Sequence, residues 1–256
     1  MENNRLAIIT GASSGIGLAC AEKFAEGGWN LLLTARRSDR LKLIAIKLEK
    51  AFKITVHIQE MDVRERESGA QLAHYITRNH LNPHLLINNA GLAVGIEPIH
   101  EGLTDDWERM IDTNIKGLLY VTRSITPLMT AQGFGHIINI GSIAGKETYP
   151  GGNVYCATKY AVDGLTKAMR MDLVPYGIKV TQVAPGAVET EFSSVRFKGD
   201  QTRATKVYQG FTPLSPADVA DAVWYCASLP AHVNVNDLVI MPTAQASATI
   251  IHRKME

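Results

Sequence analysis

Tyr155 and Lys159 stand four residues apart in the stretch NVYCATKY, a spacing that places both side chains on one face of a helix. A free phenol has a pKa near ~10 and is a poor base at neutral pH. An ammonium group beside it stabilises the phenolate and lowers this pKa, so the pair can exchange a proton as an alcohol and a carbonyl interconvert. Amphipathic helices often contain this spacing with the tyrosine as a core aromatic. The rest of the chain has to decide between the two interpretations.

Three glycines in the stretch TGASSGIG form a second candidate site. Gly11, Gly15 and Gly17 follow a short apolar run and precede a helical pattern, as in a phosphate-binding strand–turn–helix unit. Glycines there permit a tight turn close to an anion, and the helix N-terminus offers unpaired N–H groups. The stretch lacks the Lys-Ser/Thr ending of a P-loop, so we expect a dinucleotide and not a nucleoside triphosphate. The alternative is a helix entry with turn glycines and no ligand.

Two arginines follow the next apolar run, where NAD-binding sites commonly carry an acid that accepts hydrogen bonds from the ribose. Here Ala35 is followed by Arg36 and Arg37. Guanidinium groups attract a 2′-phosphate through charge and fork geometry, whereas a carboxylate repels it. The sequence therefore predicts NADP(H) as the cofactor. The alternative is a solvated pair of charges that opens the next helix.

Short apolar runs alternate with helical patterns along the chain, which is typical of βαβ units and a parallel sheet. Several runs are apolar throughout, as in strands covered on both faces. The expected strands are LAIIT (6–10), NLLLTA (30–35), ITVHIQ (54–59), LLIN (85–88), HIINIG (136–141), KVTQVA (179–184) and DLVIM (237–241). The expected helices are 16–27, 38–51, 64–79, 104–131, 153–175 and 216–228, the last opened by the N-terminal pattern SPAD. We therefore expect an α/β fold, a single-domain Rossmann-like doubly wound parallel sheet of about seven strands flanked by helices, which binds ligands at the carboxyl ends of its strands.

The composition is that of one globular domain spanning residues 1–256. Hydrophobic residues make up 46% and charged residues 20% of the chain, which excludes an intrinsically disordered protein. The formal net charge of +1 gives no reason to expect nucleic acid or an anionic membrane as a partner. No apolar run reaches the ~18 residues of a membrane span, and the first ten residues lack the pattern of a signal peptide. We expect a cytoplasmic protein.

Cysteines and histidines show no pattern of a disulfide or metal site. Cys20, Cys156 and Cys226 are far apart and odd in number, which fits neither arrangement. The eight histidines include no ligand motif, so we expect no metal. We interpret His100 and His136 as structural or exposed residues, and Cys156 as a packing residue.

Taken together, the motifs resemble those of the short-chain dehydrogenase/reductase family over nearly the whole chain. The matching motifs are TGASSGIG (10–17), DV (62–63), NNAG (88–91), DTN (112–114), IGS (140–142), YCATK (155–159) and PG (185–186). They occur in order and at fitting distances, so the set is far more specific than any single motif. The resemblance implies a seven-stranded sheet, one domain that serves both cofactor and small-molecule substrate, and assembly as a homotetramer.

The resemblance also implies a catalytic set of four residues. Tyr155 would be the acid/base, Lys159 would tune it and hold the nicotinamide ribose hydroxyls, and Ser142 would hydrogen-bond the substrate oxygen. Asn114 would bend the long helical stretch and bind a water that connects Lys159 to solvent. Alone, Ser142 could simply end a strand and Asn114 could be a capping residue between two helices. Because the four residues come from three elements that converge at one sheet edge, we interpret them as catalytic.

The cofactor contacts follow from the same resemblance. Residues of the glycine turn would face the phosphates and a ribose, Asp62 and Val63 would flank the adenine, and the NNAG segment would line the adenosine-side ribose. The Val188 backbone would bond the carboxamide, with Thr190 beside it. The NNAG segment could equally tie two strands together. The expected cofactor-binding residues are Gly11, Ser13, Ser14, Gly15, Ile16, Gly17, Arg36, Arg37, Asp62, Val63, Asn89, Ala90, Gly91, Tyr155, Lys159, Pro185, Gly186, Val188 and Thr190.

Within the family, the chain is most similar to the bacterial NADP-dependent 3-hydroxy acid dehydrogenases, which oxidise serine, allo-threonine and related short β-hydroxy acids. The similarity lies in GGNVY (151–155), EFSSVRFKGD (191–200) and LPAHVNVNDLVIMPTAQ (229–245). These stretches lie in or near the region that shapes substrate choice, so they indicate the subfamily better than the glycine turn does.

A substrate lid is expected around 187–212, where the secondary-structure pattern is poor. An acid substrate needs a cation or backbone donors near Ser142 and Tyr155. Arg196, or else Lys198, is the candidate within the lid. The alternative is that both charges are merely solvated.

The core motifs leave other functions open. A 3-oxoacyl carrier-protein reductase or a general NADPH carbonyl reductase would share all of them, and would differ in whether free hydroxy acids or only thioester-linked acyl groups react. A regulator that senses NADP(H) could use the same fold. The complete acid/base set counts against a sensor, which has no need of it.

Overall fold

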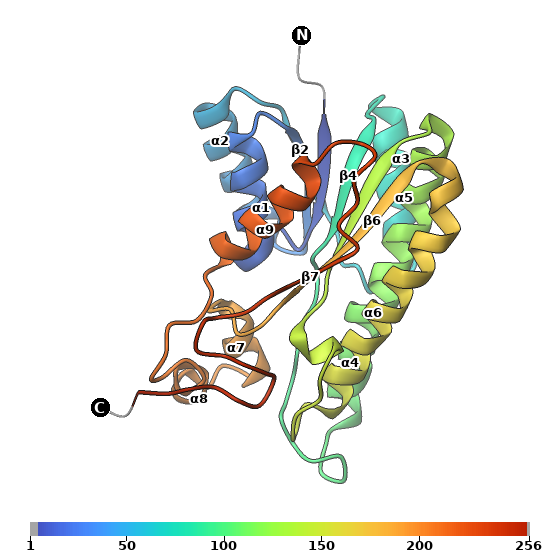
Figure 1. Cartoon of the computed structure of the whole chain (residues 1–256). Coiled ribbons are helices and arrows are strands. Elements are labelled where there is room, and N and C mark those ends of the chain that lie inside the picture. The colour runs from blue at the N-terminus through green and yellow to red at the C-terminus, as the bar shows by residue number, and fades with distance from the viewer. Residues whose placement is uncertain (1–4, 255–256) are drawn as a thin grey trace.

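One parallel sheet forms the centre of the molecule (Figure 1). The computed structural model describes residues 5–254. Seven strands follow the order β3-β2-β1-β4-β5-β6-β7, and every neighbouring pair is parallel. The strands are β1 (Leu6–Thr10), β2 (Asn30–Ala35), β3 (Val56–Glu60), β4 (Pro83–Asn88), β5 (Gly135–Ile140), β6 (Ile178–Pro185) and β7 (Asp237–Ile240). The predicted seven-stranded parallel sheet is confirmed.

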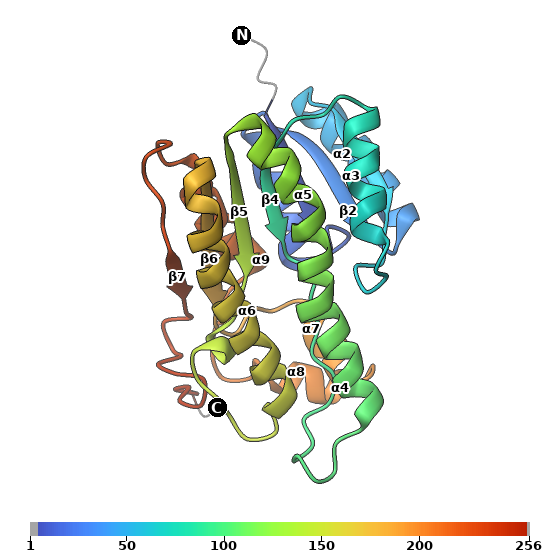
Figure 2. The same ribbon diagram turned by 90° about the vertical axis from the view of Figure 1, so that its right-hand side faces the viewer.

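Helices cover both faces of the sheet (Figures 1 and 2). One face is covered by α1 (Gly15–Glu26), α2 (Ser38–Phe52) and α9 (Pro216–Ser228). The other face is covered by α3 (Ser68–Arg78), α5 (Leu118–Gln132) and α6 (Asn153–Leu173). The remaining helical segments are α4 (Thr104–Ile111), α7 (Glu191–Arg196), α8 (Gln201–Lys206), a π-helical stretch (Asp112–Gly117) and two 3-10 turns (Ile143–Gly145 and Val174–Tyr176).

Most predicted elements agree with the observed ones to within one or two residues, and two helices differ. The helix predicted at 64–79 begins only at Ser68. The Asp62 carboxylate accepts the Arg64 N–H and the Asp62 carbonyl accepts the Ser68 hydroxyl, which holds the first residues in a turn. The helix predicted at 104–131 changes to a π-helix between α4 and α5. Such wider turns are found mostly at functional sites.

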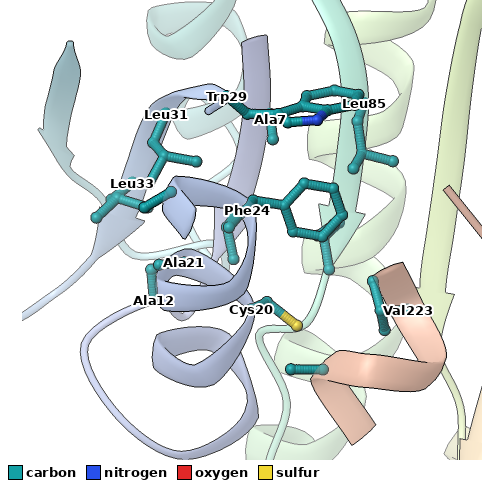
Figure 3. Packing of buried hydrophobic residues seen from close by; sticks show 14 of the residues in the cluster. Ala7, Ala12, Cys20, Ala21, Phe24, Trp29, Leu31, Leu33, Leu85 and Val223 are labelled. Atoms are coloured by element: carbon teal, nitrogen blue, oxygen red, sulfur yellow. The ribbon is translucent and has the colours of Figure 1, made fainter. Parts of the chain in front are cut away.

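The aromatic residues Phe24 and Trp29 anchor the core between the sheet and helix α1 (Figure 3). Their rings meet edge-on with centroids 5.3 Å apart, and Phe24 also meets Trp224 of α9 at 5.2 Å. Such aromatic pairs contribute about 0.5–1.5 kcal/mol beyond the burial of their area. Gly27 leaves the room for this packing, since a Cβ there would lie 2.1 Å from the Trp224 ring. The contacts hold α1, and with it the glycine turn, against the sheet.

The opposite face of the sheet is packed with aliphatic side chains of α3, α5 and α6, among them Leu72, Ile125 and Val162. Each fully buried side chain of this size contributes about 1.5–3 kcal/mol. Because helices cover both faces, every residue of β1 is buried, which explains its unbroken apolar run. Within residues 5–254, no helix has the length and apolar character needed to cross a membrane.

The order of the strands creates a crevice at their carboxyl ends. The chain adds β2 and β3 on one side of β1, and then places β4 on the other side. The loops after β1 and β4 therefore turn apart, and doubly wound sheets bind ligands at such a point. The glycine turn follows β1 and the NNAG segment overlaps the end of β4, so both predicted binding motifs meet there.

The predicted lid at 187–212 lies at this end of the sheet, where α7 and α8 are seen below the strands in Figure 1. Each helix has six residues. Thr190 caps α7 by accepting the N–H of Phe192, and Asp200 caps α8 by accepting the N–H of Arg203. The lid is thus more regular than its sequence pattern indicates.

The C-terminal segment 241–254 runs from β7 back to the lid. The N–H of Lys254 donates to the Gly210 carbonyl at 2.8 Å, and the Arg253 guanidinium donates to the Val207 carbonyl at 3.0 Å. These bonds attach the C-terminal segment to the end of the lid.

Candidate active site

A cavity of about 510 Å³ opens at the carboxyl ends of the strands. Its walls come from the glycine turn, the ends of β2, β4, β5 and β6, the lid and the C-terminal segment. The predicted site residues that line it are Gly11, Ser13, Ser14, Gly15, Ile16, Arg36, Arg37, Asp62, Val63, Asn89, Ala90, Gly91, Ser142, Tyr155, Lys159, Pro185, Gly186, Val188, Thr190 and Arg196. Gly17 and Asn114 do not line it. The fold therefore gathers nearly all the candidates around one space.

The glycine turn needs its glycines for two different reasons. Gly11 and Gly15 have φ angles of 67° and 55°, in the left-handed region that favours glycine. Gly17 is needed for packing, since a Cβ there would lie 2.5 Å from the Gly11 carbonyl oxygen. The Ser14 side chain makes no capping bond, so the first N–H groups of α1 are available to an anion.

The NNAG segment ties neighbouring strands together. The Thr10 hydroxyl accepts the backbone N–H groups of Asn89 and Ala90 at 3.0 Å each, and the Asn89 amide donates to the Thr10 carbonyl at 2.8 Å. The Asn88 amide donates to Asn139 of β5 at 2.9 Å. The segment thus has the structural role that the sequence left open, while Asn89 and Ala90 also face the cavity.

Charged side chains surround the cavity at the end of β2. Arg37 donates to the Ser13 hydroxyl at 3.0 Å, and Arg36 lines the cavity beside it. Asp62, after β3, accepts hydrogen bonds from the Arg64 guanidinium at 2.6 and 3.0 Å. Burial opposes ionisation of Asp62, but the bonds from Arg64 outweigh it and lower the pKa of the carboxyl. This end of the cavity thus gathers more cationic than anionic side chains, with Arg36, Arg37 and Arg64 around Asp62.

The predicted acid/base pair lies at the other end of the cavity. Tyr155 and Lys159 are buried side chains of α6, and Ser142 follows β5. The Tyr155 ring meets Phe192 of the lid edge-on at 5.7 Å. The Lys159 ammonium donates to the Ile140 carbonyl at 2.9 Å. All three predicted catalytic side chains at this end therefore face the same space.

Burial has the largest effect on the pKa values of Tyr155 and Lys159. It raises the pKa of Tyr155 well above its usual value, as does the nearby Tyr149, whereas a hydrogen bond with Ser142 and the charge of Arg196 act in the opposite direction. It lowers the pKa of Lys159 to about 8. Lys159 thus remains largely charged at neutral pH, although the tuning of Tyr155 by Lys159 stays a prediction.

Asn114 lies in the π-helical stretch, behind the cavity wall. Its amide accepts the Leu92 N–H at 2.9 Å and donates to the Leu92 carbonyl at 2.8 Å and to the Thr158 hydroxyl at 3.0 Å. These bonds join the loop after β4 to helix α6, next to Lys159. Its predicted part in a proton relay stays a prediction.

The two candidate cations of the lid, Arg196 and Lys198, have different surroundings. Lys198 forms an ion pair with Asp106 of α4 at 2.7 Å, and it does not line the cavity. The Arg196 guanidinium lines the cavity, 5.3 Å from the Tyr149 ring and 5.9 Å from the Tyr155 ring. Its Nη2 atom is buried and makes no hydrogen bond within the described chain. Arg196 is therefore placed for an anion beside the acid/base, and Lys198 is not.

Several wall residues are not found from sequence patterns. Tyr149 precedes the YCATK motif and packs under Arg196. Phe192, Tyr208, Gln245, Ala248 and Ile251 also line the cavity. Gln245 ends the subfamily motif LPAHVNVNDLVIMPTAQ, which was the one indication that the C-terminal segment reaches the site. Its amide oxygen accepts the Ala187 N–H at 2.8 Å and so holds the start of the lid.

The surroundings of His100, His136 and Cys156 agree with the structural or exposed roles that the sequence predicts for them. His136 is buried against the Thr181 hydroxyl at 2.8 Å, and burial lowers its pKa to about 3. His100 lies exposed beside Glu101. Burial raises the pKa of the Cys156 thiol. None of the three lines the cavity.

The residues around the cavity fit a dinucleotide phosphate. The first turn of α1 offers N–H groups for a pyrophosphate, and Arg36 and Arg37 offer charge for a further phosphate. At the far end, the Tyr155 hydroxyl and the Lys159 ammonium face the place where a reactive ring would meet a substrate.

Comparisons with known proteins agree with this geometry. Residues 5–201 match the family model described as short chain dehydrogenase. The chain is 43% identical over 251 residues to NADP-dependent 3-hydroxy acid dehydrogenase YdfG of Escherichia coli K12, covering 97% of this chain and 100% of that protein. It is 45% identical over 242 residues to sulfoacetaldehyde reductase 2 of Chromohalobacter salexigens, covering 94% and 95%. A solved structure of the closed form of serine dehydrogenase with NADP+ superimposes with a TM-score of 0.90 at 43% identity, covering 97% and 100%.

Proposed function

This chain belongs to the short-chain dehydrogenase family and is an oxidoreductase, and we propose that it transfers a hydride between NADP(H) and a short 3-hydroxy acid or the matching 3-oxo acid. The observation that supports this most is the Arg196 guanidinium, whose unpaired Nη2 atom lies beside Tyr155. The similarity to NADP-dependent 3-hydroxy acid dehydrogenase over 97% of the chain supports the same substrate class.

Each catalytic residue has a distinct task in this proposal. When bound, NADP(H) would supply the hydride acceptor for oxidation of the alcohol and the hydride donor for reduction of the carbonyl. The Tyr155 oxygen takes the hydroxyl proton as the alcohol is oxidised, and returns it to the carbonyl oxygen in reduction. Ser142 holds the substrate oxygen against Tyr155, and the Lys159 ammonium stabilises the phenolate and holds the ribose hydroxyls. Asn114 supports the path by which the proton leaves.

The position of Arg196 limits the length of the substrate. Its guanidinium lies 5.9 Å from the Tyr155 ring, so an acid group bound there must be only a few bonds from the reacting carbon. A 3-hydroxy acid such as serine, allo-threonine or 3-hydroxypropionate meets this condition. A thioester-linked acyl group carries no charge for Arg196 to bind, which disfavours a 3-oxoacyl carrier-protein reductase.

A sulfonate-bearing aldehyde is a second candidate substrate. The unpaired Nη2 atom of the Arg196 guanidinium suits a sulfonate as well as a carboxylate. Two relatives at 45% and 43% identity are named sulfoacetaldehyde reductases.

A substrate screen tests the proposed function. NADP reduction is measured with both serine enantiomers, the threonine diastereomers, 3-hydroxypropionate, 3-hydroxyisobutyrate and 2-hydroxyethanesulfonate, with the methyl ester of each good acid, and with a 3-hydroxyacyl thioester. We expect the best acid to exceed its ester in kcat/KM by about 10-fold or more, because the ester loses a charge-assisted bond. Equal rates for acids and esters would point to a general carbonyl reductase, and activity with thioesters alone to the carrier-protein enzyme.

Arg196→Ala tests the anion site itself. We expect kcat/KM for the best acid to fall about 10- to 100-fold, which corresponds to the ~1.5–3 kcal/mol of a hydrogen bond to a charged group. Steady-state kinetics measures this, and Lys198→Ala is the control because Lys198 pairs with Asp106 away from the cavity. A change within about twofold for Arg196→Ala would remove Arg196 from the site.

We further propose that the protein works as a cytoplasmic homotetramer, without nucleic acid or membrane partners. Exposed apolar side chains on α5 and α6 support a subunit interface there. They include Leu119, Tyr160 and Met171, the last 71% exposed.

A further inference from the structure

The two neighbouring arginines after β2 have different surroundings. Arg37 makes hydrogen bonds through all three of its guanidinium nitrogen atoms: its Nε and Nη2 atoms donate to the Ser13 hydroxyl at 3.1 and 3.0 Å, Nη2 also donates to Ser14 at 2.7 Å, and Nη1 pairs with Glu191 at 3.0 Å. Arg36 lines the same cavity and forms no hydrogen bond or close ion pair within the described chain, while its charge helps to lower the pKa of Asp62. The sequence predicts one shared task for the two residues, and their contacts indicate two.

Glu191 connects the lid to the opposite wall of the cavity. It is the first residue of α7. One carboxylate oxygen pairs with Arg37 at 3.0 Å, and the other pairs with Arg40 of α2 at 2.9 Å. Hydrogen bonds from Arg40 and Arg37 lower the pKa of the Glu191 carboxyl, so it stays charged at neutral pH. One lid residue thus forms ion pairs with two arginines from another part of the fold.

This connection crosses the phosphate-binding turn. Arg37 and Glu191 both line the cavity, whereas Arg40 lies outside it. Thr190, next to Glu191, lies directly over the turn, since a Cβ on Gly15 would be 3.4 Å from its methyl group. The ion pairs therefore connect the lid to the opposite wall beside the N-terminus of α1, where the pyrophosphate of a dinucleotide would bind.

We infer that the two arginines have separate tasks, and this inference rests on the proposed NADP(H) dependence. Arg36 supplies the charge that recognises the 2′-phosphate. Arg37, Arg40 and Glu191 form an ionic clasp that holds the lid over the bound dinucleotide and slows its release. Glu191 acts through the lid and not on the reacting atoms, so it is a positioning residue.

Release rates test the clasp. NADPH and NADH are bound to the purified protein, and their release is followed by stopped-flow loss of nicotinamide fluorescence on dilution into excess oxidised cofactor. We expect Glu191→Gln to speed the release of both cofactors about threefold to fivefold, as appropriate for a small network of half-exposed ion pairs. Arg40→Gln, which does not touch the cavity, should act in the same direction. The matched control is Lys42→Gln, which removes an exposed ion pair of α2 with Asp39.

Equilibrium affinities test the task of Arg36. We expect Arg36→Ala to raise the Kd for NADPH about 10-fold or more, because a charge-assisted bond to the phosphate is lost, and to leave the Kd for NADH within about twofold. Glu191→Gln should weaken both cofactors by similar factors. The ratio of the two Kd values therefore separates phosphate recognition from lid closure.

The other outcomes contradict the inference. If Glu191→Gln tightened NADPH and left NADH unchanged, the carboxylate would compete with the 2′-phosphate and not clasp the lid. Unchanged release from Glu191→Gln and Arg40→Gln would also exclude the clasp. If the unsubstituted protein bound neither cofactor, the proposed function itself would fail.

Discussion

Tyr155→Phe is expected to lower kcat with the best hydroxy acid by about 10³-fold or more, because general acid–base catalysis contributes up to about 10⁴-fold. The substitution removes one hydroxyl and keeps the ring, so the edge-on contact with Phe192 at 5.7 Å persists. The Kd for NADPH should change by no more than about twofold, since the cofactor loses none of its charge-assisted contacts.

Initial rates with NADP and fluorescence titration with NADPH measure the two effects. The control is Tyr160→Phe, which makes the same change on the same helix at an exposed residue whose hydroxyl donates to the Lys146 carbonyl. It should retain nearly full activity. Turnover of Tyr155→Phe within about tenfold of the unsubstituted protein would rule out Tyr155 as the acid/base.

Lys159→Met is expected to abolish turnover and at the same time to stabilise the fold at neutral pH. Burial lowers the pKa of Lys159 from 10.5 to about 8, which corresponds to a cost of about 3 kcal/mol for keeping the charge buried. Methionine avoids this cost and fills similar space. It also leaves the Ile140 carbonyl without its bond, which costs about 1 kcal/mol. We therefore expect the free energy of unfolding to rise by about 2 kcal/mol at pH 7.

The pH dependence identifies the cause of this stabilisation. Below pH 8, Lys159 is protonated in both states and the penalty is fully present. Between about pH 8 and 10.5 the folded chain loses this proton first, so the unsubstituted protein gains stability as the pH rises and the advantage of methionine shrinks. Denaturant unfolding without cofactor at pH 7 and pH 9.5 measures the difference in free energy of unfolding between Lys159→Met and the unsubstituted protein. The exposed Lys167→Met is the control. An unsubstituted protein more stable than Lys159→Met at pH 7 would contradict the argument.

The regular part of the fold could be predicted because its causes are local. Helix α9 was placed at its observed bounds, since the capping box of Ser215 and Asp218 and a proline in the first turn mark its start. The strands were found from apolar runs that helices on both faces require. The resemblance predicted a bend at Asn114 but not the π-helical stretch that contains it. The bonds of Asn114 to Leu92 and Thr158 join residues far apart in the sequence, which no local pattern indicates.

The sequence predicted which residues line the candidate site, but not the contacts that these residues make with one another. The end of a parallel strand predicts that Arg36 and Arg37 face the crevice, but no spacing links Arg37 to Glu191, which lies 154 residues further on. The six-residue helices of the lid have too few residues for a periodic pattern, so α7 and α8 were expected as irregular structure. Tyr149 was missed because only its packing against Arg196 marks it.

The C-terminal segment has a practical consequence for how the protein is handled. It forms part of the cavity wall with Ala248 and Ile251, and holds the lid through Arg253 and Lys254. An affinity tag or fusion partner attached after residue 254 would therefore sit beside the lid and this part of the cavity wall. The first described strand starts at the opposite end of the sheet, far from the cavity (Figure 1). Purification tags and surface attachment thus belong at the amino end.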